Sequence, residues 1–347
     1  MDTMLKFNES DLKALNCALQ SCRKAAILTH THPDGDALGS TIALKHFLMD
    51  VLKKDAVIIT PTVAPSTLSF LSDGEGILVT ENTPGTVREM IAESDLIFGL
   101  DISGLERTDD AAKWVEESGA TKILIDHHLA PRTDQFSLVF SMTNVSSTCE
   151  LLYFLLKKLP SGLAAIPMES LEAIMVGMTT DSNNFANSVF PTTLEMASEL
   201  LEAGVDRDAI IDNLYKNDRE ERVRAFSWLL SNKLTLTPAG VAFIVIDADT
   251  YAELGIIEGE TEGLVNIPLG IGRVKISVLA KASDGLFRIS IRSKRGVSAN
   301  RLAREYFNGG GHEQAAGGKF DPAANSFSIE EYIETATAQF LQENQSK

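Results

Sequence analysis

The sequence predicts an α/β protein with two domains and a helical connector between them. We expect an N-terminal domain (1–190) with a mainly parallel sheet flanked by helices, a connector (191–235) and a smaller C-terminal α/β domain (236–347). The 347 residues exceed the usual size of one domain. In the first half, short apolar runs alternate with helical patterns, as in βαβ units. Strand patterns return only after a long helical stretch.

The N-terminal elements follow from the spacing of apolar residues. A helix is expected over residues 8–22, where Asn8 or Ser10 can serve as its N-cap. Further helical patterns cover 37–51 and 109–119, and strand patterns cover 25–30, 56–60, 95–101 and 122–126. Because these apolar runs are nearly continuous, we expect strands that are covered on both faces.

The remaining elements divide into a helical part and a second sheet. Residues 146–231 have mostly helical periodicity. Strands are then expected over 241–247, 274–281 and 286–292, followed by helices over 299–307 and 329–341 with a glycine cluster at 309–318 between them.

The charge distribution restricts the partners of this protein. The chain has 31 Lys and Arg residues against 48 Asp and Glu, for a formal net charge of −17. Such a surface should repel long duplex nucleic acid, whose binding depends on basic residues. However, residues 273–304 contain nine basic residues and a single acidic one, Asp284. About half of these bases should lie on a solvated sheet face, and the rest favour a small phosphate-bearing substrate.

The cysteines and the hydropathy pattern indicate a cytoplasmic protein. Cys17, Cys22 and Cys149 form no CxxC pair, which favours a reducing compartment and excludes a zinc knuckle. The first residues lack the apolar core of a signal peptide. No uncharged apolar run approaches the roughly 18 residues that a membrane span needs.

Acidic residues and histidines gather at the ends of the expected strands. They are His30, Asp34, Asp36, Asp101, Asp126, His127 and His128, and Asp181 follows an apolar helical run. Singly, Asp101 or Asp181 is more typical of a turn or a helix end. Together, converging carboxylates and imidazoles would destabilise one sheet edge unless cations neutralised them. Oxygen and nitrogen ligands without a thiolate favour Mn²⁺, Mg²⁺, Fe²⁺ or Co²⁺, and several carboxylates can hold two metals.

The motifs that contain these residues resemble those of one enzyme family. HTHPDGDALGS, LDIS, IDHH and TTDSNNF are similar, in this order, to the four motifs of the DHH phosphoesterases. GGGHEQAAGG (309–318), with SIRS upstream, resembles the DHHA1 substrate-binding domain of that family. The two-domain length is similar to the nanoRNase/pAp-phosphatase branch, which acts on short oligoribonucleotides.

The resemblance implies a role for each residue of the motifs. His30 and Asp34 would hold one divalent cation, Asp36, His127 and Asp181 a second, and Asp101 would bridge the two. Mn²⁺ is the expected ion, with Mg²⁺ or Co²⁺ as alternatives. Asp126 would orient His127 and its neighbours, and His128 would face the scissile phosphate. Asn183 stands where the family often has glycine, and asparagine tolerates the left-handed backbone that such a turn needs.

The resemblance also implies substrate-binding residues in the second domain. Arg292 can pair bidentately with a phosphate, and Ser293 follows it in the family's motif. Gly309, Gly310 and Gly311 would let backbone N–H groups approach a phosphate closely, beside His312.

The sequence thus predicts a metal-dependent phosphoric ester hydrolase. The cations would activate a water that attacks phosphorus in line, releasing mononucleotides from short oligonucleotides and removing the 3′-phosphate of pAp. The alternatives are a cyclic-dinucleotide (c-di-AMP or pApA) phosphodiesterase, an exopolyphosphatase, a pyrophosphatase and a processive single-strand exonuclease. A nucleotide-binding sensor without activity is the non-enzymatic alternative. RNA or DNA preference, direction of cleavage, the physiological metal and assembly as a homodimer remain open.

Overall fold

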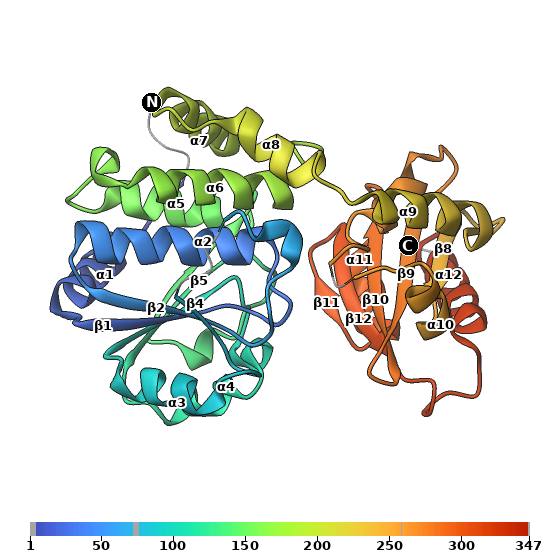
Figure 1. The fold of residues 1–347 in the computed structure, drawn as a ribbon, viewed down its shortest axis with the longest axis horizontal. Coiled ribbons are helices and arrows are strands. Elements are labelled where there is room, and N and C mark those ends of the chain that lie inside the picture. The colour runs from blue at the N-terminus through green and yellow to red at the C-terminus, as the bar shows by residue number, and fades with distance from the viewer. Residues whose placement is uncertain (1–4, 72–75, 258, 346–347) are drawn as a thin grey trace. The chain divides into compact units, whose positions relative to one another are not determined.

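The computed structural model describes residues 5–71, 76–257 and 259–345 of the chain. It divides into two compact units, Met1–Asn217 and Asp218–Lys347. Each unit contains one six-stranded sheet with helices packed on its faces (Figure 1). The α/β class expected from the sequence is therefore confirmed.

The sheet of the first unit is entirely parallel, and its strand order is β3-β2-β1-β4-β5-β6. The strands are β1 (Lys24–Leu28), β2 (Asp55–Thr60), β3 (Ile77–Val79), β4 (Leu96–Leu100), β5 (Thr121–Asp126) and β6 (Leu138–Ser141). This is the order of a doubly wound sheet: β1 to β3 are added toward one edge, and β4 to β6 are added toward the other, so the strand order reverses between β1 and β4. The short strands β3 and β6 at the two edges had no clear sequence signal.

Helices cover both faces of this sheet, so its central strands are apolar on both sides. One face packs against α3 (Pro84–Glu93) and α4 (Ala111–Glu117). The other packs against α1 (Glu9–Ser21), α2 (Gly35–His46), α5 (Thr148–Lys158) and α6 (Met168–Asp181). Figure 1 shows α2, α5 and α6 on the side of the sheet opposite α3 and α4. A π-helical turn, Phe47–Val51, extends α2 over the range expected for one helix.

The second unit has a mixed sheet in the order β11-β12-β10-β9-β8-β7. Its strands are β7 (Thr235–Leu236), β8 (Val241–Ile246), β9 (Ile276–Ser283), β10 (Leu286–Ser293), β11 (Gly310–Gly311) and β12 (Ala315–Phe320). β8 and β9 run parallel, and every other pair is antiparallel. The glycine cluster at 309–318 contains β11 and the first four residues of β12.

Two apolar clusters lie on opposite faces of this second sheet. One contains α11 (Ala299–Tyr306) and α12 (Ile329–Gln345), and the other contains α9 (Glu220–Asn232) and packs beside α10 (Ala248–Glu253). The helices expected as a connector are divided between the units: α7 (Pro191–Glu202) and α8 (Arg207–Tyr215) belong to the first, and α9 to the second. No helix within the described part of the chain is long and apolar enough to span a bilayer.

Candidate functional site

The ligand-type side chains of the first unit meet where the strand order reverses. His30 comes two residues after β1, and Asp101 directly follows β4, its neighbour in the sheet. In doubly wound sheets, ligands bind outside the carboxyl ends of the strands at this switch point. The fold therefore brings together residues that lie about 70 positions apart in the chain.

The segment between β1 and α2 orients the first two of these side chains. Asp34 is the N-cap of α2, and its Oδ1 accepts hydrogen bonds from the backbone N–H groups of Asp36 (3.1 Å) and Ala37 (3.0 Å). Its Oδ2 lies 3.9 Å from His30 Nε2. His30 Nδ1 lies 2.9 Å from the carbonyl oxygen of Thr31, so Nδ1–H donates there and Nε2 faces the carboxylates.

Asp36 belongs to the first turn of α2, and its fully buried carboxylate faces the start of α5. Its Oδ2 accepts from the N–H of Thr148 at 2.7 Å and its Oδ1 from the N–H of Cys149 at 2.9 Å. These are the first two amides of the helix, where a negative charge is stabilised by the helix dipole. The backbone of α5 thus fixes the Asp36 carboxylate at the sheet edge.

Asp101 lies at the centre of the cluster, and its two oxygens face different groups. Oδ2 lies 3.5 Å from His30 Nε2, whereas Oδ1 lies 3.5 Å from His127 Nε2 and accepts a 3.1 Å hydrogen bond from Thr148 Oγ1. Asp101 has a φ of +60°, the left-handed conformation that aspartate adopts more readily than most residues. This conformation ends β4, and the carboxylate that it places at the strand end is buried.

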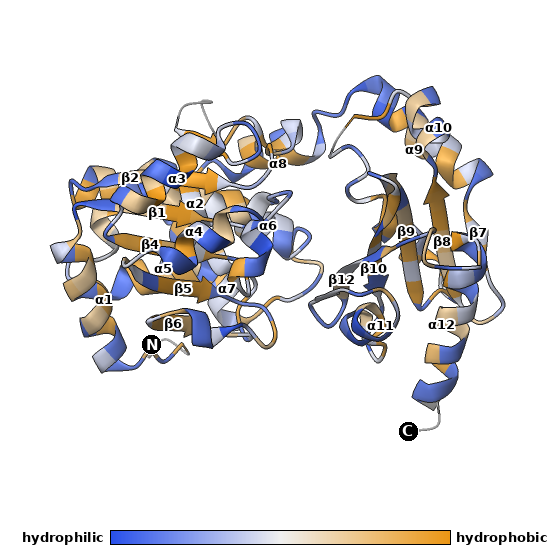
Figure 2. Ribbon diagram, turned by 90° about the horizontal axis from the view of Figure 1, so that it is seen from below, coloured by the Kyte–Doolittle hydropathy of each residue, from blue (hydrophilic) through white to orange (hydrophobic). Residues whose placement is uncertain are grey.

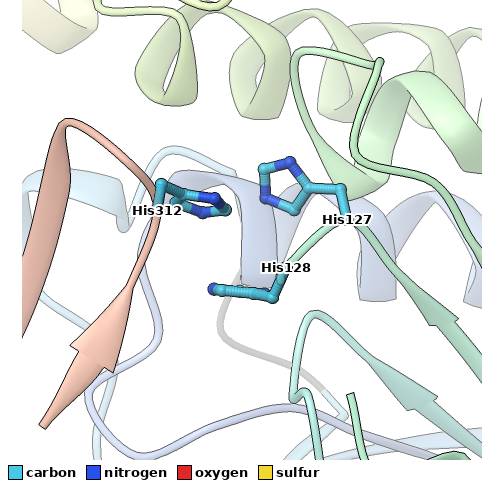
Figure 3. Close-up of side chains that lie close together, drawn as sticks. All are labelled: His127, His128 and His312. Carbon is cyan, nitrogen blue, oxygen red and sulfur yellow. The ribbon is translucent and has the colours of Figure 1, made fainter. Parts of the chain in front are cut away.

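The end of β5 carries Asp126 and is followed by two histidines, shown in Figure 3. His127 Nε2 contacts Asp181 Oδ2 (3.1 Å) and Asp36 Oδ2 (3.7 Å). His128 Nδ1 lies 2.9 Å from Asp126 Oδ1, and its backbone N–H donates to Asp126 Oδ2. Asp126 therefore fixes the ring of His128, which is one of the neighbours that it was expected to orient.

Asp181 reaches the cluster from another direction, because it is the last residue of α6. The turn after it contains Asn183, whose φ is +47°. Asparagine therefore adopts the left-handed conformation that the turn requires. The two following residues, Asn184 and Phe185, also have positive φ values. Three consecutive non-glycine residues of this turn, Asn183 to Phe185, therefore have a left-handed backbone conformation.

The electrostatics of the cluster reflect several carboxylates in a buried space. Burial, followed by the charges of Asp101 and Asp181, raises the pKa of Asp36 well above its ordinary value. Burial opposes ionisation of Asp101 as well, but the imidazoles of His128, His30 and His127 outweigh it and lower its pKa. Burial lowers the pKa of His127, but the carboxylates of Asp181, Asp101 and Asp36 together outweigh this effect and raise the pKa to about 10.

The oxygen and nitrogen atoms around Asp101 are grouped closely enough to hold a metal ion. Three groups in the first unit each place their oxygen and nitrogen atoms within 4.8 Å of one another, and Asp101 belongs to all three. The groups are His30–Asp34–Asp101, Asp36–Asp101–His127 and Asp101–Asp126–His128. Hard oxygen ligands with imidazoles suit divalent cations such as Mn²⁺, so the residues fit.

Arg107 is a site residue that the sequence interpretation missed. Its Nη1 donates to the carbonyl oxygen of Asp101 at 3.4 Å and lies 3.3 Å from His128 Nε2. Its own carbonyl accepts from the N–H of Thr31, which ties the loop after β4 to the loop after β1. A lone arginine six residues after Asp101 carries no motif, so only the fold reveals this contact.

In the second unit, the structure separates two residues that were expected to act together. Arg292 and Ser293 are consecutive on β10 and therefore point to opposite faces of the sheet. Ser293 is buried, and its hydroxyl donates to the carbonyl oxygen of Val297 at 2.6 Å. Ser290, two residues before Arg292, is the serine that shares its face.

The glycine cluster forms a tightly packed edge of the second sheet. Gly310 pairs with Gly317 and Gly311 with Ala316, and the N–H of His312 donates to the carbonyl oxygen of Ala315. A Cβ atom at Gly309 would lie 1.9 Å from the carbonyl oxygen of Gly317. Glycine is required here because two backbone segments approach closely.

Comparisons with known proteins agree with this two-part organisation. The model of the DHH family, N-terminal domain, matches residues 24–178, and the model of the DHHA1 domain matches residues 240–341. The first match covers β1 to α6 with every candidate metal ligand except Asp181. The second match covers β8 to β12, which include Arg292 and the glycine cluster.

Individual relatives match over most of the chain. The crystal structure of an exopolyphosphatase-related protein from Bacteroides fragilis is 32% identical, with 99% of this chain and 98% of that one covered and a TM-score of 0.88. The bifunctional oligoribonuclease and PAP phosphatase NrnA of Thermus thermophilus is 28% identical, over 84% of this chain and 82% of that protein. The cyclic-di-AMP phosphodiesterase GdpP of Geobacillus thermodenitrificans is 24% identical, over 86% of this chain and 45% of that protein.

Proposed function

The chain belongs to the DHH family and is a phosphoric ester hydrolase, and from this premise we propose that it hydrolyses short oligonucleotides to mononucleotides. We further propose that it removes the 3′-phosphate of pAp. The first unit would carry out hydrolysis with two divalent cations, Mn²⁺ in the first place, and the second would bind substrate. The similarity to NrnA over most of both chains supports this specificity.

The arrangement around Asp101 is the observation that carries the proposal. Its Oδ2 faces His30, which lies beside Asp34, and its Oδ1 faces His127, which lies beside Asp36 and Asp181. A carboxylate with each oxygen turned to a separate ligand group suits a bridging role between two cations. His30 and Asp34 would hold one cation, and Asp36, His127 and Asp181 the other.

The remaining residues prepare the site for a phosphate. When bound, the cations supply Lewis acidity and lower the pKa of a bound water. Asp126 holds the His128 ring through the 2.9 Å contact at Nδ1, so that Nε2 is directed away from Asp126. Arg107, beside that Nε2, adds a fixed positive charge that would stabilise charge developing on phosphate oxygens. In the second unit, Arg292, the backbone of Gly309–Gly311 and His312 would contact the substrate.

Hydrolysis of a length series tests the proposal. The full-length protein is incubated with Mn²⁺ and labelled RNAs of two to twenty-four nucleotides, and bound Mn²⁺ is measured by equilibrium dialysis. We expect the shortest RNAs to be cleaved fastest and two Mn²⁺ ions to bind per chain. Faster cleavage of the longest RNA would contradict the assignment to short substrates.

An Asp101→Asn variant tests the bridging role in the same assays. It should lose at least one bound Mn²⁺ and nearly all activity, because both ligand groups share this carboxylate. Asp110→Asn is the matched control, since Asp110 is exposed at the start of α4 and its side chain makes no cap hydrogen bond. Unchanged Mn²⁺ binding and activity in Asp101→Asn would refute the metal assignment.

A cyclic-dinucleotide phosphodiesterase is the second candidate, and the similarity to GdpP favours it. The chain corresponds to less than half of that relative, whereas it covers most of NrnA. Comparing kcat/KM for c-di-AMP, pApA and pAp with the same preparation separates the two functions. A higher kcat/KM for c-di-AMP than for linear dinucleotides would select the second candidate.

A further inference from the structure

The turn that follows Asp181 has an unusual backbone for its composition. Asn183, Asn184 and Phe185 have φ values of +47°, +54° and +65°, although none of them is glycine. Asparagine tolerates this left-handed conformation, whereas it is rare and unfavourable for a bulky residue such as Phe185. Strained residues of this kind persist only where the surrounding structure holds them in place. The contacts that hold this turn therefore matter for the candidate metal ligand that precedes it.

The turn is bonded to the last turn of α6, which carries Asp181. The N–H of Asn183 donates to the carbonyl oxygen of Thr180 at 3.0 Å, and the N–H of Asn184 donates to the carbonyl oxygen of Thr179 at 2.7 Å. Both carbonyls are among the last four of the helix, which have no partner within the helix itself. If the turn loosens, the end of α6 loses these bonds, and the Asp181 carboxylate is no longer held among the other candidate ligands.

Arg207, the first residue of α8, contacts two of the three left-handed residues. Its Nη2 donates to Asn184 Oδ1 at 2.5 Å, and its guanidinium carbon lies 5.8 Å from the ring centre of Phe185. A guanidinium within about 6 Å of a ring centre is attracted to the face of the ring. Phe185 also packs against the core of the first unit. Arg207 thus holds one residue of the turn by a hydrogen bond and the next by its charge.

The packing of α8 places Arg207 beside this turn. Asp206 is the N-cap of the helix, and its side chain accepts a backbone hydrogen bond at 3.0 Å. Arg207, Ile210 and Leu214 are spaced three and four residues apart, so they lie on one face of the helix. Ile210 is buried, and Leu214 packs against the core of the first unit. Figure 2 shows both hydrophobic and hydrophilic residues along α8, as expected for a helix with one packed face. Arg207 lies on that packed face.

We propose that Arg207 is a positioning residue for the metal ligand Asp181, which it holds indirectly by fixing the turn that contains Asn184 and Phe185. This inference rests on the proposed function, because it requires that Asp181 binds a divalent cation. It extends that function to a residue outside the regions 24–178 and 240–341 that match the family models. Loss of Arg207 should therefore weaken metal binding without removing any ligand.

The test measures Mn²⁺ binding to the full-length protein by calorimetric titration for wild type, Arg207→Met, Arg207→Lys and Arg88→Met. Methionine removes the hydrogen bond and the charge but keeps an unbranched side chain, whereas lysine keeps the charge. Arg88→Met is the matched control, because Arg88 is an exposed base in α3, on the face of the sheet opposite α6. Hydrogen exchange of residues 182–188 and the thermal midpoint are measured in EDTA, so that both report on the metal-free protein.

For Arg207→Met, we expect one of the two Mn²⁺ ions to bind about 10- to 100-fold more weakly, as when a group that supports a metal ligand is lost. Hydrogen exchange of residues 182–188 should be faster, Arg207→Lys should lie between Arg207→Met and wild type, and Arg88→Met should match wild type. Unchanged Mn²⁺ affinity or unchanged exchange in Arg207→Met would overturn the inference. A lower thermal midpoint with unchanged Mn²⁺ affinity would also overturn it, because Arg207 would then support only the packing of α8.

A double-mutant cycle with Asn184→Ala tests whether Arg207 acts through the turn. Each single variant removes one partner of the same hydrogen bond. The loss of Mn²⁺ affinity in Arg207→Met/Asn184→Ala should therefore be smaller than the product of the two single losses. A loss equal to that product would show that Arg207 and the turn act independently, and the inference would be wrong.

Cleavage of a dinucleotide RNA separates this role from direct contact with the substrate. The kcat of Arg207→Met should fall about tenfold at Mn²⁺ concentrations that only half-saturate wild type, in line with the weaker metal binding. It should return to the wild-type value at saturating Mn²⁺. A loss of kcat that saturating Mn²⁺ does not restore would place Arg207 at the substrate and contradict the positioning role.

Failure of the proposed function gives a different result from failure of this inference. If wild type binds two Mn²⁺ ions but cleaves no oligonucleotide, the proposed function fails, while the titrations still decide the role of Arg207. If wild type cleaves short RNAs and Arg207→Met binds Mn²⁺ as wild type does, only the inference fails. If wild type binds no Mn²⁺, Asp181 is not a metal ligand and both are wrong.

Discussion

Replacing Gly177 by alanine should displace Asp36, one of the candidate metal ligands. Gly177 lies in α6 against the start of α5 and the side chain of Asp36. A Cβ atom added there would lie 2.3 Å from Cys149 Sγ, 2.9 Å from Asp36 Oδ1 and 3.1 Å from Asp36 Cα. Carbon needs about 3.5–4.0 Å from such atoms, and Cys149 is fully buried, so α6 or α5 must shift.

The size of the effect follows from these contacts. Overpacking of this kind should lower the free energy of unfolding by about 2–3 kcal/mol. Displacement of Asp36 should weaken Mn²⁺ binding by about 10- to 100-fold, as changes next to metal ligands do. Cys149→Ala alone should cost about 1 kcal/mol, because it removes one buried sulfur. Combined with Gly177→Ala, it should recover about 1–2 kcal/mol, since the closest clash is gone.

Tryptophan fluorescence in denaturant can isolate the relevant unit. The chain has two tryptophans, Trp114 in α4 of the first unit and the partly exposed Trp228 in α9 of the second. In a Trp228→Phe background, Trp114 reports unfolding of the metal-binding unit alone, and calorimetric titration measures Mn²⁺ affinity. Gly85→Ala is the control, because nothing lies within 4 Å of a Cβ atom at that position. Unchanged stability and Mn²⁺ affinity in Gly177→Ala would refute the packing argument.

Two other variants test how the site is supported. Glu150 is fully buried in α5 and accepts hydrogen bonds from the Ser146 N–H and hydroxyl and from the hydroxyls of Thr192 and Thr193. Glu150→Ala should cost about 4 kcal/mol, because four donors lose their acceptor, and a loss below 1 kcal/mol in the Trp114 assay would contradict this. Arg107→Met should lower kcat at least about tenfold, because the variant loses the positive charge beside His128 Nε2. The Mn²⁺ stoichiometry should be unchanged, because the contacts of Asp101 and His128 with the other candidate metal ligands remain. Steady-state kinetics and dialysis measure both quantities, and an unaltered kcat would show that Arg107 has no part in the reaction.

The sequence was informative about the first unit because several candidate metal ligands come at or just after the ends of its strands. Buried parallel strands appear as continuous apolar runs, and a polar residue directly after such a run marks the sheet edge. His30, Asp101 and Asp126 could be assigned to one edge for this reason. The edge strands β3 and β6 were missed, because they are short and only partly buried.

Other parts of the site had no sequence signal. Arg107 contacts His128 only because the loop after β4 folds over the end of β5. The SIRS motif contains two serines, Ser290 and Ser293, and its letters do not show which of them lies beside Arg292. The alternation of side chains along β10 places Ser290 on the same face as Arg292. Lys319 lies outside the basic stretch identified from the sequence, and only the β10–β12 register places it opposite Arg288.

By itself, the sequence determined the α/β class, the family motifs and the residues that can hold a metal, because periodicity and side-chain chemistry are local properties. The tertiary structure alone decided the separate directions of the two Asp101 oxygens, the support of Asp36 by the α5 amides and the pairing of Arg288 with Lys281 and Lys319 across the second sheet. These features depend on contacts between segments that are distant in the chain, and a sequence pattern cannot specify the register or orientation of such contacts.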